Sequence, residues 1–330
     1  MNPKATGKII MLWAGIFAVT LLCSSADAAK KLQKVLVFDK WSTTDHTTQQ
    51  RAGDSLIARL SRQIGFQFVV SSDAAQITDA NLAQYQVIVF NNNGYDFLPL
   101  DANRNALIKW VNNGGGCVAW HAADANHQLW PWWCDSLIGA DLVTHVVATA
   151  RVYSETKNVG KPAYDSLMKG VTPSFNMNEE WYNLSPDPSK NSAITILQLL
   201  DETSYSGGTM GGYHSMSWCR EYGPNKARMV YSAIGHEVPS YTNANFVQFI
   251  SNALTWASKD SGNVTSVVEI PRSIQNRVSA LPEGYSLFDH GSAMKTFLLN
   301  GRATANRLRS NQIVIRDLND RQWIPVLQIR

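Results

Sequence analysis

The sequence lacks an excess of charge of either sign. It has 29 lysines and arginines against 26 aspartates and glutamates, a formal charge of +3, and no dense basic cluster. Proteins that bind nucleic acid or anionic membranes through charge usually carry such a cluster, so we expect neither partner. Charged residues make up only 17% of the chain and hydrophobic residues 45%, which favours a globular core and argues against disorder.

Long hydrophobic runs are also missing, except near the N-terminus. Lys4 and Lys8 precede the run IIMLWAGIFAVTLLC, which is short for a membrane span, and Ala26-Asp27-Ala28 fits an A-x-A cleavage pattern. We predict a signal peptide over residues 1–28. The mature protein would then be exported by a bacterium to the periplasm, the cell surface or the medium, without a membrane-spanning segment.

Cysteine is scarce, and the predicted mature chain keeps only Cys117, Cys134 and Cys219. Three is an odd number, so at most one internal disulfide can form and one thiol remains. Cys117 falls in a predicted buried strand and is expected to be a core residue. A Cys134–Cys219 bond is compatible with an oxidising compartment, and the sequence leaves it open.

Short apolar runs alternate with amphipathic segments over residues 34–140. The runs typical of strands buried on both faces are residues 34–40, 66–72, 85–92 and 116–121. Helical patterns cover residues 45–65 and 101–115 and begin again at residue 129. This alternation predicts an α/β fold with a doubly wound, mostly parallel sheet. Less regular strands follow over residues 145–235, and a helix over 243–259 closes the domain.

The character of the chain changes after Lys259. We predict a polar linker over residues 260–270 and a small β-rich module over 271–330, built from the runs GYSLFD, MKTFLL, NQIVIRDL and QWIPVLQIR. The alternative is an extra layer of strands on the main domain. The module loosely resembles the C-terminal β modules of secreted bacterial proteins, which implies binding to the cell surface or to secretion machinery.

Polar side chains gather where the predicted strands end. In an open parallel sheet, ligands bind outside the carboxyl ends of the strands. Residues at or just beyond such ends are Asp39, His46, Asn93, Tyr95, His121, Asp124 and His236. The segment NEEWYNL adds Glu179 and Glu180, and His214 opens a later strand. The alternatives are ordinary core or surface histidines and solvated loop carboxylates.

A carboxylate beside several histidines suits proton transfer or a divalent metal such as zinc. The metal signal is weak, because the sequence has no H-x-x-x-H pair. Tryptophans flank the same polar residues and could stack on sugar rings. They are Trp41, Trp120, Trp130, Trp132, Trp133, Trp181 and Trp218. Ordinary core packing is the alternative for each, and we favour it for Trp120.

Six segments resemble, in order and spacing, the ThuA-like (trehalose utilisation) family over about residues 34–257. They are LVFDKWSTTDHTTQQ, GGGCVAWHAAD, LIGADLVTH, EEWYNL, LDETSYSGGTMGGYHSMSWCREY and YSAIGHEVPSY. The resemblance implies a fold similar to class I glutamine amidotransferases, of flavodoxin-like layout, and a role with disaccharides, notably trehalose and 3-keto sugars. The residues that match the motif positions are His46, His121, His145, Glu180, Tyr182, His214 and His236. His145 is followed by Val146, where the family commonly has proline, so the loop shape there is in question.

In the amidotransferase fold the turn after the fourth strand presents a nucleophilic cysteine. His121 stands at that position here, and Cys117 lies four residues earlier inside the strand. Glutamine amidotransferase activity is therefore not expected.

These observations together predict a sugar-active, hydrolase-type enzyme, with a non-catalytic carbohydrate-binding protein as the alternative. The predicted catalytic residues are His121, His46, Glu180, His214 and His236. The predicted substrate-binding residues are Asn93, Asp124, His145, Trp181, Tyr182 and Trp132. The candidate metal ligands are His121, His145, His214 and His236.

Overall fold

The computed structural model describes residues 31–41, 46–125 and 130–259, together with the backbone of three C-terminal strands. The predicted signal peptide (1–28), the predicted linker (260–270) and the predicted strand at 294–299 lie outside the described residues. The chain divides into two compact units, residues 1–267 and 268–330.

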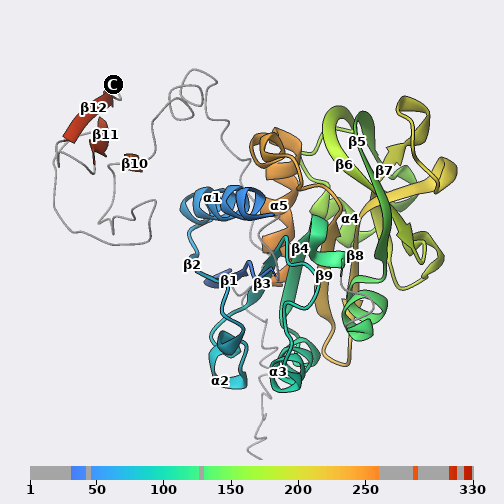
Figure 1. Ribbon diagram of the computed structural model, residues 1–330, viewed down its shortest axis with the longest axis horizontal. Helices are drawn as coiled ribbons and strands as arrows, with labels where there is room; N and C mark the ends of the chain where they lie inside the picture. Colours follow the sequence, from blue (N-terminus) through green and yellow to red (C-terminus); the bar gives the residue numbers. More distant parts are fainter. Residues whose placement is uncertain are drawn as a thin grey trace, which may run out of the picture. The chain divides into compact units, whose positions relative to one another are not determined.

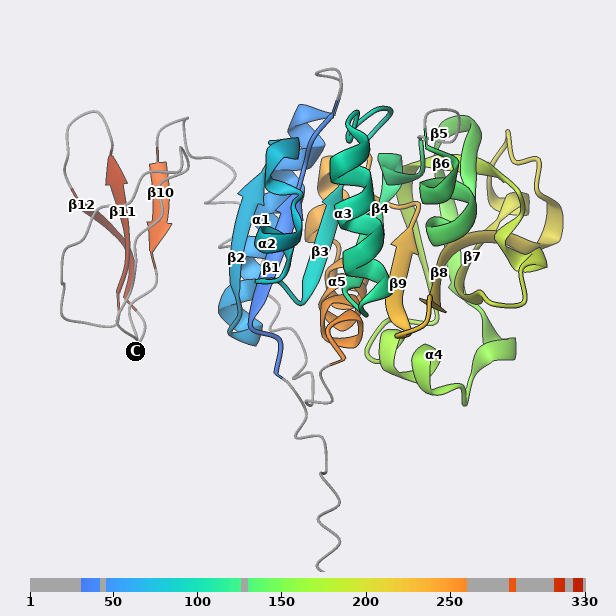
Figure 2. The same cartoon turned by 90° about the horizontal axis from the view of Figure 1, so that it is seen from below.

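The first half of a nine-stranded sheet is parallel. Its strands, in the order β2-β1-β3-β4-β9, are β2 (Gln67–Ser71), β1 (Lys34–Phe38), β3 (Val87–Asn91), β4 (Gly116–Trp120) and β9 (Ala227–Ser232). Helices α1 (Thr47–Ile64) and α5 (Ala244–Ala257) cover one face, and α2 (Asp79–Leu82) and α3 (Asp101–Asn112) cover the other (Figures 1 and 2). Coverage on both faces explains why β3 and β4 are buried at every residue. The predicted doubly wound α/β fold is confirmed.

The second half of the sheet is antiparallel. It continues from β9 through β8 (His214–Tyr222), β7 (Thr195–Asp201), β5 (Asp141–Ser154) and β6 (Ser174–Ser185). Helix α4 (Pro162–Leu167) lies between β5 and β6 in the chain. Strand β6 contains EEWYNL, which the sequence did not predict as a strand. Residues 179–184 are all buried, so this stretch shows none of the alternation that marks a half-buried strand.

Short helical turns complete the first unit. The helix predicted from residue 129 is a π-helical segment, η3 (Trp132–Ile138), which ends at Gly139 in the left-handed region. The 3₁₀ turns are η1 (Ala74–Gln76), η2 (His121–Asp124), η4 (Thr156–Asn158), η5 (Pro188–Lys190), η6 (Glu202–Ser204), η7 (Gly211–Tyr213) and η8 (Val238–Thr242).

Free, buried thiols are found at Cys117, Cys134 and Cys219, so the Cys134–Cys219 bond that the sequence left open is not formed. Cys117 lies inside β4, as expected of a core residue. Burial raises the pKa of its thiol, and it therefore stays protonated at neutral pH.

The second unit contains an antiparallel sheet of strands β10 (Tyr285–Phe288), β11 (Gln312–Asp317) and β12 (Trp323–Gln328), in that order. Across the described parts of the chain, no helix combines the length and apolar character needed to cross a bilayer.

Candidate functional site

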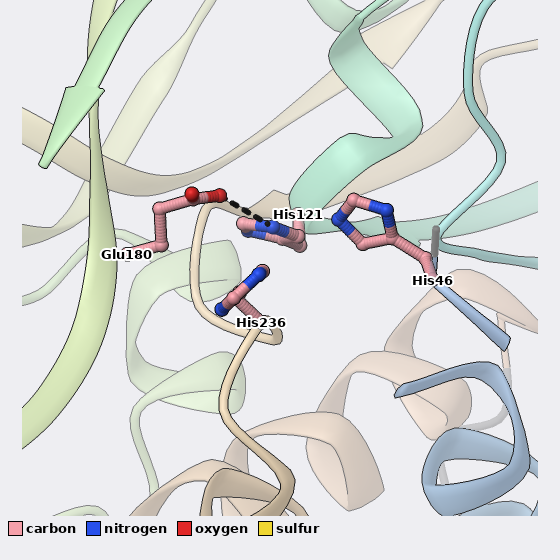
Figure 3. Close-up of side chains that lie close together, drawn as sticks. All are labelled: His46, His121, Glu180 and His236. Atoms are coloured by element: carbon pink, nitrogen blue, oxygen red, sulfur yellow. Dashed lines mark ion pairs between the residues drawn. The ribbon is translucent and has the colours of Figure 1, made fainter. Parts of the chain in front are cut away.

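Four side chains meet at the edge formed by the carboxyl ends of the parallel strands. His46 directly precedes α1, His121 follows β4, and His236 follows β9. Glu180 comes from β6 in the antiparallel half and points at His121 (Figure 3). One ligand atom from each of the four lies within 4.8 Å of the others. We call these four residues the imidazole–carboxylate cluster.

His121 leaves the sheet through a constrained backbone. Its φ of 49° lies in the left-handed region, which costs a non-glycine residue about 1–2 kcal/mol. Its Nδ1 lies 3.1 Å from the carbonyl oxygen of Ala233, which can only accept, so Nδ1 carries a hydrogen. Nε2 is then the nitrogen that gains or loses a proton, and it faces the cluster.

Gly235 allows the backbone that follows β9 to lie close to Trp120 and His121. Its φ is 142°, and a Cβ there would lie 2.9 Å from Cδ1 of Trp120 and 3.2 Å from Cβ of His121.

Glu180 and Tyr182 both contact Nε2 of His121. They are two residues apart on β6 and so project from the same face of the strand. Oε2 of Glu180 lies 3.2 Å from Nε2, and the Tyr182 hydroxyl lies 2.8 Å from it. The neutral ring accepts a hydrogen bond from Tyr182, and the protonated ring can donate to Glu180.

Three histidines hold Glu180 in its ionised form. Burial alone would raise the pKa of Glu180, but a hydrogen bond from His121 and the charges of His121, His236 and His145 lower it to about 2. Nδ1 of His145 lies 2.8 Å from Oε1 of Glu180, and the His145 side chain is half exposed. His145 therefore binds the other carboxylate oxygen from the rim of the site.

An aromatic wall positions His46. The Trp41 ring lies 4.5 Å from the His46 ring, with 31° between their planes. A Cβ on Gly94 would fall 1.8 Å from Cζ3 of Trp41, so the indole packs directly on the Gly94 backbone. Tyr95 meets the edge of Trp41 and is 52% exposed. Tyr95 thus offers an open aromatic surface beside the cluster.

The predicted catalytic residue His214 lies apart from the cluster. It is fully buried, its Nδ1 lies 2.8 Å from Oε1 of Glu202, and its Nε2 lies 2.7 Å from the carbonyl oxygen of Tyr182. Both nitrogens are occupied by acceptors, so His214 links Glu202 to the backbone of β6 and supports Tyr182 from behind.

Comparison with known proteins identifies the chain's relatives. A model of the ThuA family, described as trehalose utilisation, matches residues 34–257. The chain belongs to the ThuA family. A comparison with curated protein sequences found no match.

Solved structures of ThuA-like proteins share the fold. One from Bacteroides uniformis is 24% identical, with 72% of this chain and 96% of that chain covered and a TM-score of 0.59. Another from Parabacteroides merdae is 17% identical, with 72% and 93% covered and a TM-score of 0.53. The glutaminase domain of Trypanosoma brucei CTPS also matches, at 7% identity, with 71% and 97% covered and a TM-score of 0.44.

Four further residues predicted to bind substrate in this ThuA chain lie outside the imidazole–carboxylate cluster. Trp181 is fully buried and donates to the carbonyl oxygen of Ala148. Asn93 is fully buried and donates to the carbonyl oxygen of Lys40. Asp124 is fully buried, and burial raises the pKa of its carboxyl well above the usual range. Trp132 donates to the hydroxyl of Tyr222, at the end of β8 remote from His214.

Sequence reasoning missed the partners of the histidines in this ThuA chain. Glu202 holds His214, and Glu179 holds the loop that carries His236. The pairing of Leu200 with His214 in the β7–β8 hairpin would have placed Glu202 near His214, had the register been known. Glu179 had no such signal, because its partners outside its own strand are backbone amides and the Ser240 hydroxyl, which lie far away in the sequence.

Proposed function

We propose that this ThuA protein is an exported bacterial enzyme that hydrolyses or otherwise processes a disaccharide, a glycoside or a 3-keto sugar at the imidazole–carboxylate cluster. One observation carries the proposal. His121 keeps the Nδ1 hydrogen on Ala233 and turns Nε2 towards Glu180, whose pKa is lowered to about 2. A fixed imidazole beside an ionised carboxylate is the arrangement that general acid–base catalysis requires.

Each residue has a role in this proposal. Nε2 of His121 takes or returns the proton of a sugar hydroxyl or of water. Glu180 stabilises the imidazolium that results, and Tyr182 keeps the ring in place through its hydroxyl. His46 completes the site on the side of His121 opposite Glu180, and His236 completes it beside the His121 ring (Figure 3).

The same residues fit a divalent metal ion, zinc being the best match. Three imidazoles and one carboxylate are ligands that zinc prefers, and the four donor atoms already lie within 4.8 Å of one another. The bond from Nδ1 of His121 to a carbonyl oxygen is the usual outer partner of a metal-binding histidine. A bound ion would supply Lewis-acid chemistry. Of the four histidines predicted as metal ligands, His145 and His214 would lie outside the donor set. His46 and Glu180, which were not predicted as ligands, would belong to it.

Aromatic exposure favours Tyr95 over the tryptophans as the residue that contacts the sugar. Trp120, Trp133, Trp181 and Trp218 are fully buried, so their faces are not open to a ligand. Tyr95 is half exposed and adjoins the cluster through Trp41. Trp41 and Trp132 are partly exposed, so a non-catalytic protein that binds sugars by tryptophan stacking would depend on these two residues rather than on the buried four.

The test is turnover by the purified mature chain of trehalose, 3-keto-trehalose and a panel of other glycosides. We expect His121→Ala and Glu180→Ala each to lower kcat/KM at least about 100-fold. Glu221→Gln, an exposed change on β8, should leave it unchanged. Turnover that survives both alanine changes would refute the assignment. Calorimetry that shows sugar binding without any product would support the binding protein instead.

Elemental analysis of protein purified without a histidine tag tests the metal. We expect about one zinc ion per chain in the wild type and a loss of zinc on His121→Ala. Activity that persists after chelation in protein free of metal would remove the ion from the proposal and leave the acid–base roles.

A further inference from the structure

Glu179 and Glu180 are neighbours on β6 and project from opposite faces of the strand. Glu180 faces the histidines. Glu179 is fully buried and faces the loop between β9 and η8, which carries His236. The two carboxylates therefore have different partners, although the sequence presents them as a simple pair.

Glu179 binds that loop through its backbone. Its carboxylate accepts hydrogen bonds from the amides of Gly235 at 3.1 Å, His236 at 3.0 Å and Glu237 at 3.0 and 3.1 Å. The hydroxyl of Ser240 donates at 2.6 Å, and the amide of Glu180 donates at 3.0 Å. Amides of four residues and one hydroxyl converge on this buried carboxylate, whose oxygens are therefore hydrogen-bonded within the protein.

Other contacts also hold this loop in position. The Tyr241 hydroxyl donates to the carbonyl oxygen of Gly235 and accepts from Asn92, which ties the loop to the end of β3. Gly235 itself has no room for a side chain against Trp120 and His121. From the antiparallel half of the sheet, Met216 on β8 accepts from the amide of Ala233 at the start of the loop, and Glu179 on β6 binds the backbone of His236 itself.

We infer that Glu179 is the positioning residue of the site: its carboxylate sets the backbone of residues 235–237 so that the His236 imidazole faces His46 and His121. The His236 ring lies 5.5 Å from the His46 ring and 5.2 Å from the His121 ring. The inference rests on the proposed site. It requires neither turnover of a sugar nor a bound metal.

The test is Glu179→Gln in the full mature chain, observed without added metal. Glutamine replaces one acceptor oxygen with an amide NH2 group, a donor that cannot accept from the N–H groups of the loop. We expect amide exchange of residues 235–237 to accelerate at least about tenfold. The ring resonances of His236 should shift, while those of His145 stay in place. Ser240→Ala removes one donor and should give a smaller change of the same kind, so it tests the inference if Glu179→Gln does not fold. Glu221→Gln is the matched control.

Titration with zinc gives an independent measurement, the affinity of the site for the ion. Loss of an outer-shell contact typically weakens metal binding 10–100-fold, and we expect that loss for Glu179→Gln. A wild-type chain that binds no zinc would refute the metal centre, while the exchange and resonance measurements would still decide the role of Glu179. Unchanged exchange and His236 resonances in both Glu179→Gln and Ser240→Ala would overturn the inference.

Discussion

Two buried histidines in this protein differ in what their nitrogens face. Both nitrogens of His214 face oxygen acceptors, the Glu202 carboxylate and the Tyr182 carbonyl. A carbonyl accepts only, so Nε2 of His214 carries a hydrogen and has no lone pair for a proton or a metal. His121 faces one carbonyl and turns its other nitrogen to the cluster. The two histidines thus differ in whether Nε2 is held by a carbonyl oxygen or faces the cluster.

His214→Gln should therefore act on stability. Removing a buried hydrogen-bonding partner typically costs about 1–3 kcal/mol, because the groups that it contacted, here the Glu202 carboxylate and the Tyr182 carbonyl, lose a donor. We expect a loss of that size in the free energy of unfolding, measured with urea. The exposed Glu221→Gln should change it by less than about 1 kcal/mol. A His214→Gln protein of normal stability that has lost activity would instead place His214 in the chemistry.

The pKa of Glu180 makes a second prediction at this scale. A value of about 2 lies below the ordinary glutamate value of about 4.3, so ionised Glu180 stabilises the folded state above that ordinary value. This contribution is lost as the pH falls from about 4.3 towards 2, and the gap in stability between the wild type and Glu180→Gln should close over the same window.

Carbon NMR of the Glu180 carboxyl measures the shift directly. His145→Gln removes one of the neighbouring charges and should raise the pKa of Glu180 towards its ordinary value. A carboxyl that titrates near 4.3 in the wild type would contradict the arrangement around Glu180.

At the level of elements, the segments that follow β1 and β3 position His46 together. The Trp41 indole lies on the Gly94 backbone, and His46 lies against Trp41. A methyl group at residue 94 would occupy the space of the indole.

Gly94→Ala should therefore displace Trp41 and, with it, His46. We expect a loss of about 1–3 kcal/mol in unfolding free energy, as for other overpacked sites, together with weaker zinc binding. Gly212→Ala is the matched control, since a Cβ there meets nothing within 4 Å. Equal zinc affinity in the Gly94→Ala and Gly212→Ala proteins would show that Trp41 does not position His46.

The sequence predicted the elements whose burial is regular. The strands that became β1, β3 and β4 were recognisable because helices cover both faces and leave continuous apolar runs. Strand β6 was missed because its buried residues include two carboxylates, an asparagine and a tyrosine, which are not typical of a strand in the hydrophobic core. Their burial depends on partners far away in the chain, such as His121 and the loop at 235–237.

The site follows the same division. His46, His121 and His236 could be predicted from their places after parallel strands, since such ends share one edge. Trp132 and Trp181 were predicted to bind substrate because they flank the polar residues in the sequence, and the structure shows their indole nitrogens engaged within the protein. No local sequence pattern indicates that Asp124 is fully buried, because its burial depends on how η2 packs against the rest of the protein.

At the scale of the whole molecule, every residue of the cluster lies in the first compact unit. For residues 268–330 we propose a role in attachment to the cell surface or to secretion machinery. A mature chain that ends at Asp260 should fold with one cooperative melting transition and keep full turnover or sugar binding. Scanning calorimetry and the glycoside assay check this, with the full mature chain as the reference. An insoluble product would mean that the main core extends past residue 260.

The four residues of the cluster lie at positions 46, 121, 180 and 236, so they are spread along most of the sequence of the first unit. A ribosome produces them in that order. When β6 has been synthesised, the nascent chain still lacks His236, and Glu179 still lacks the amides that it binds. Completion of the cluster must therefore be a late event in the biogenesis of this protein. A chain that stalls before the β9 loop carries three of the four residues and no finished site.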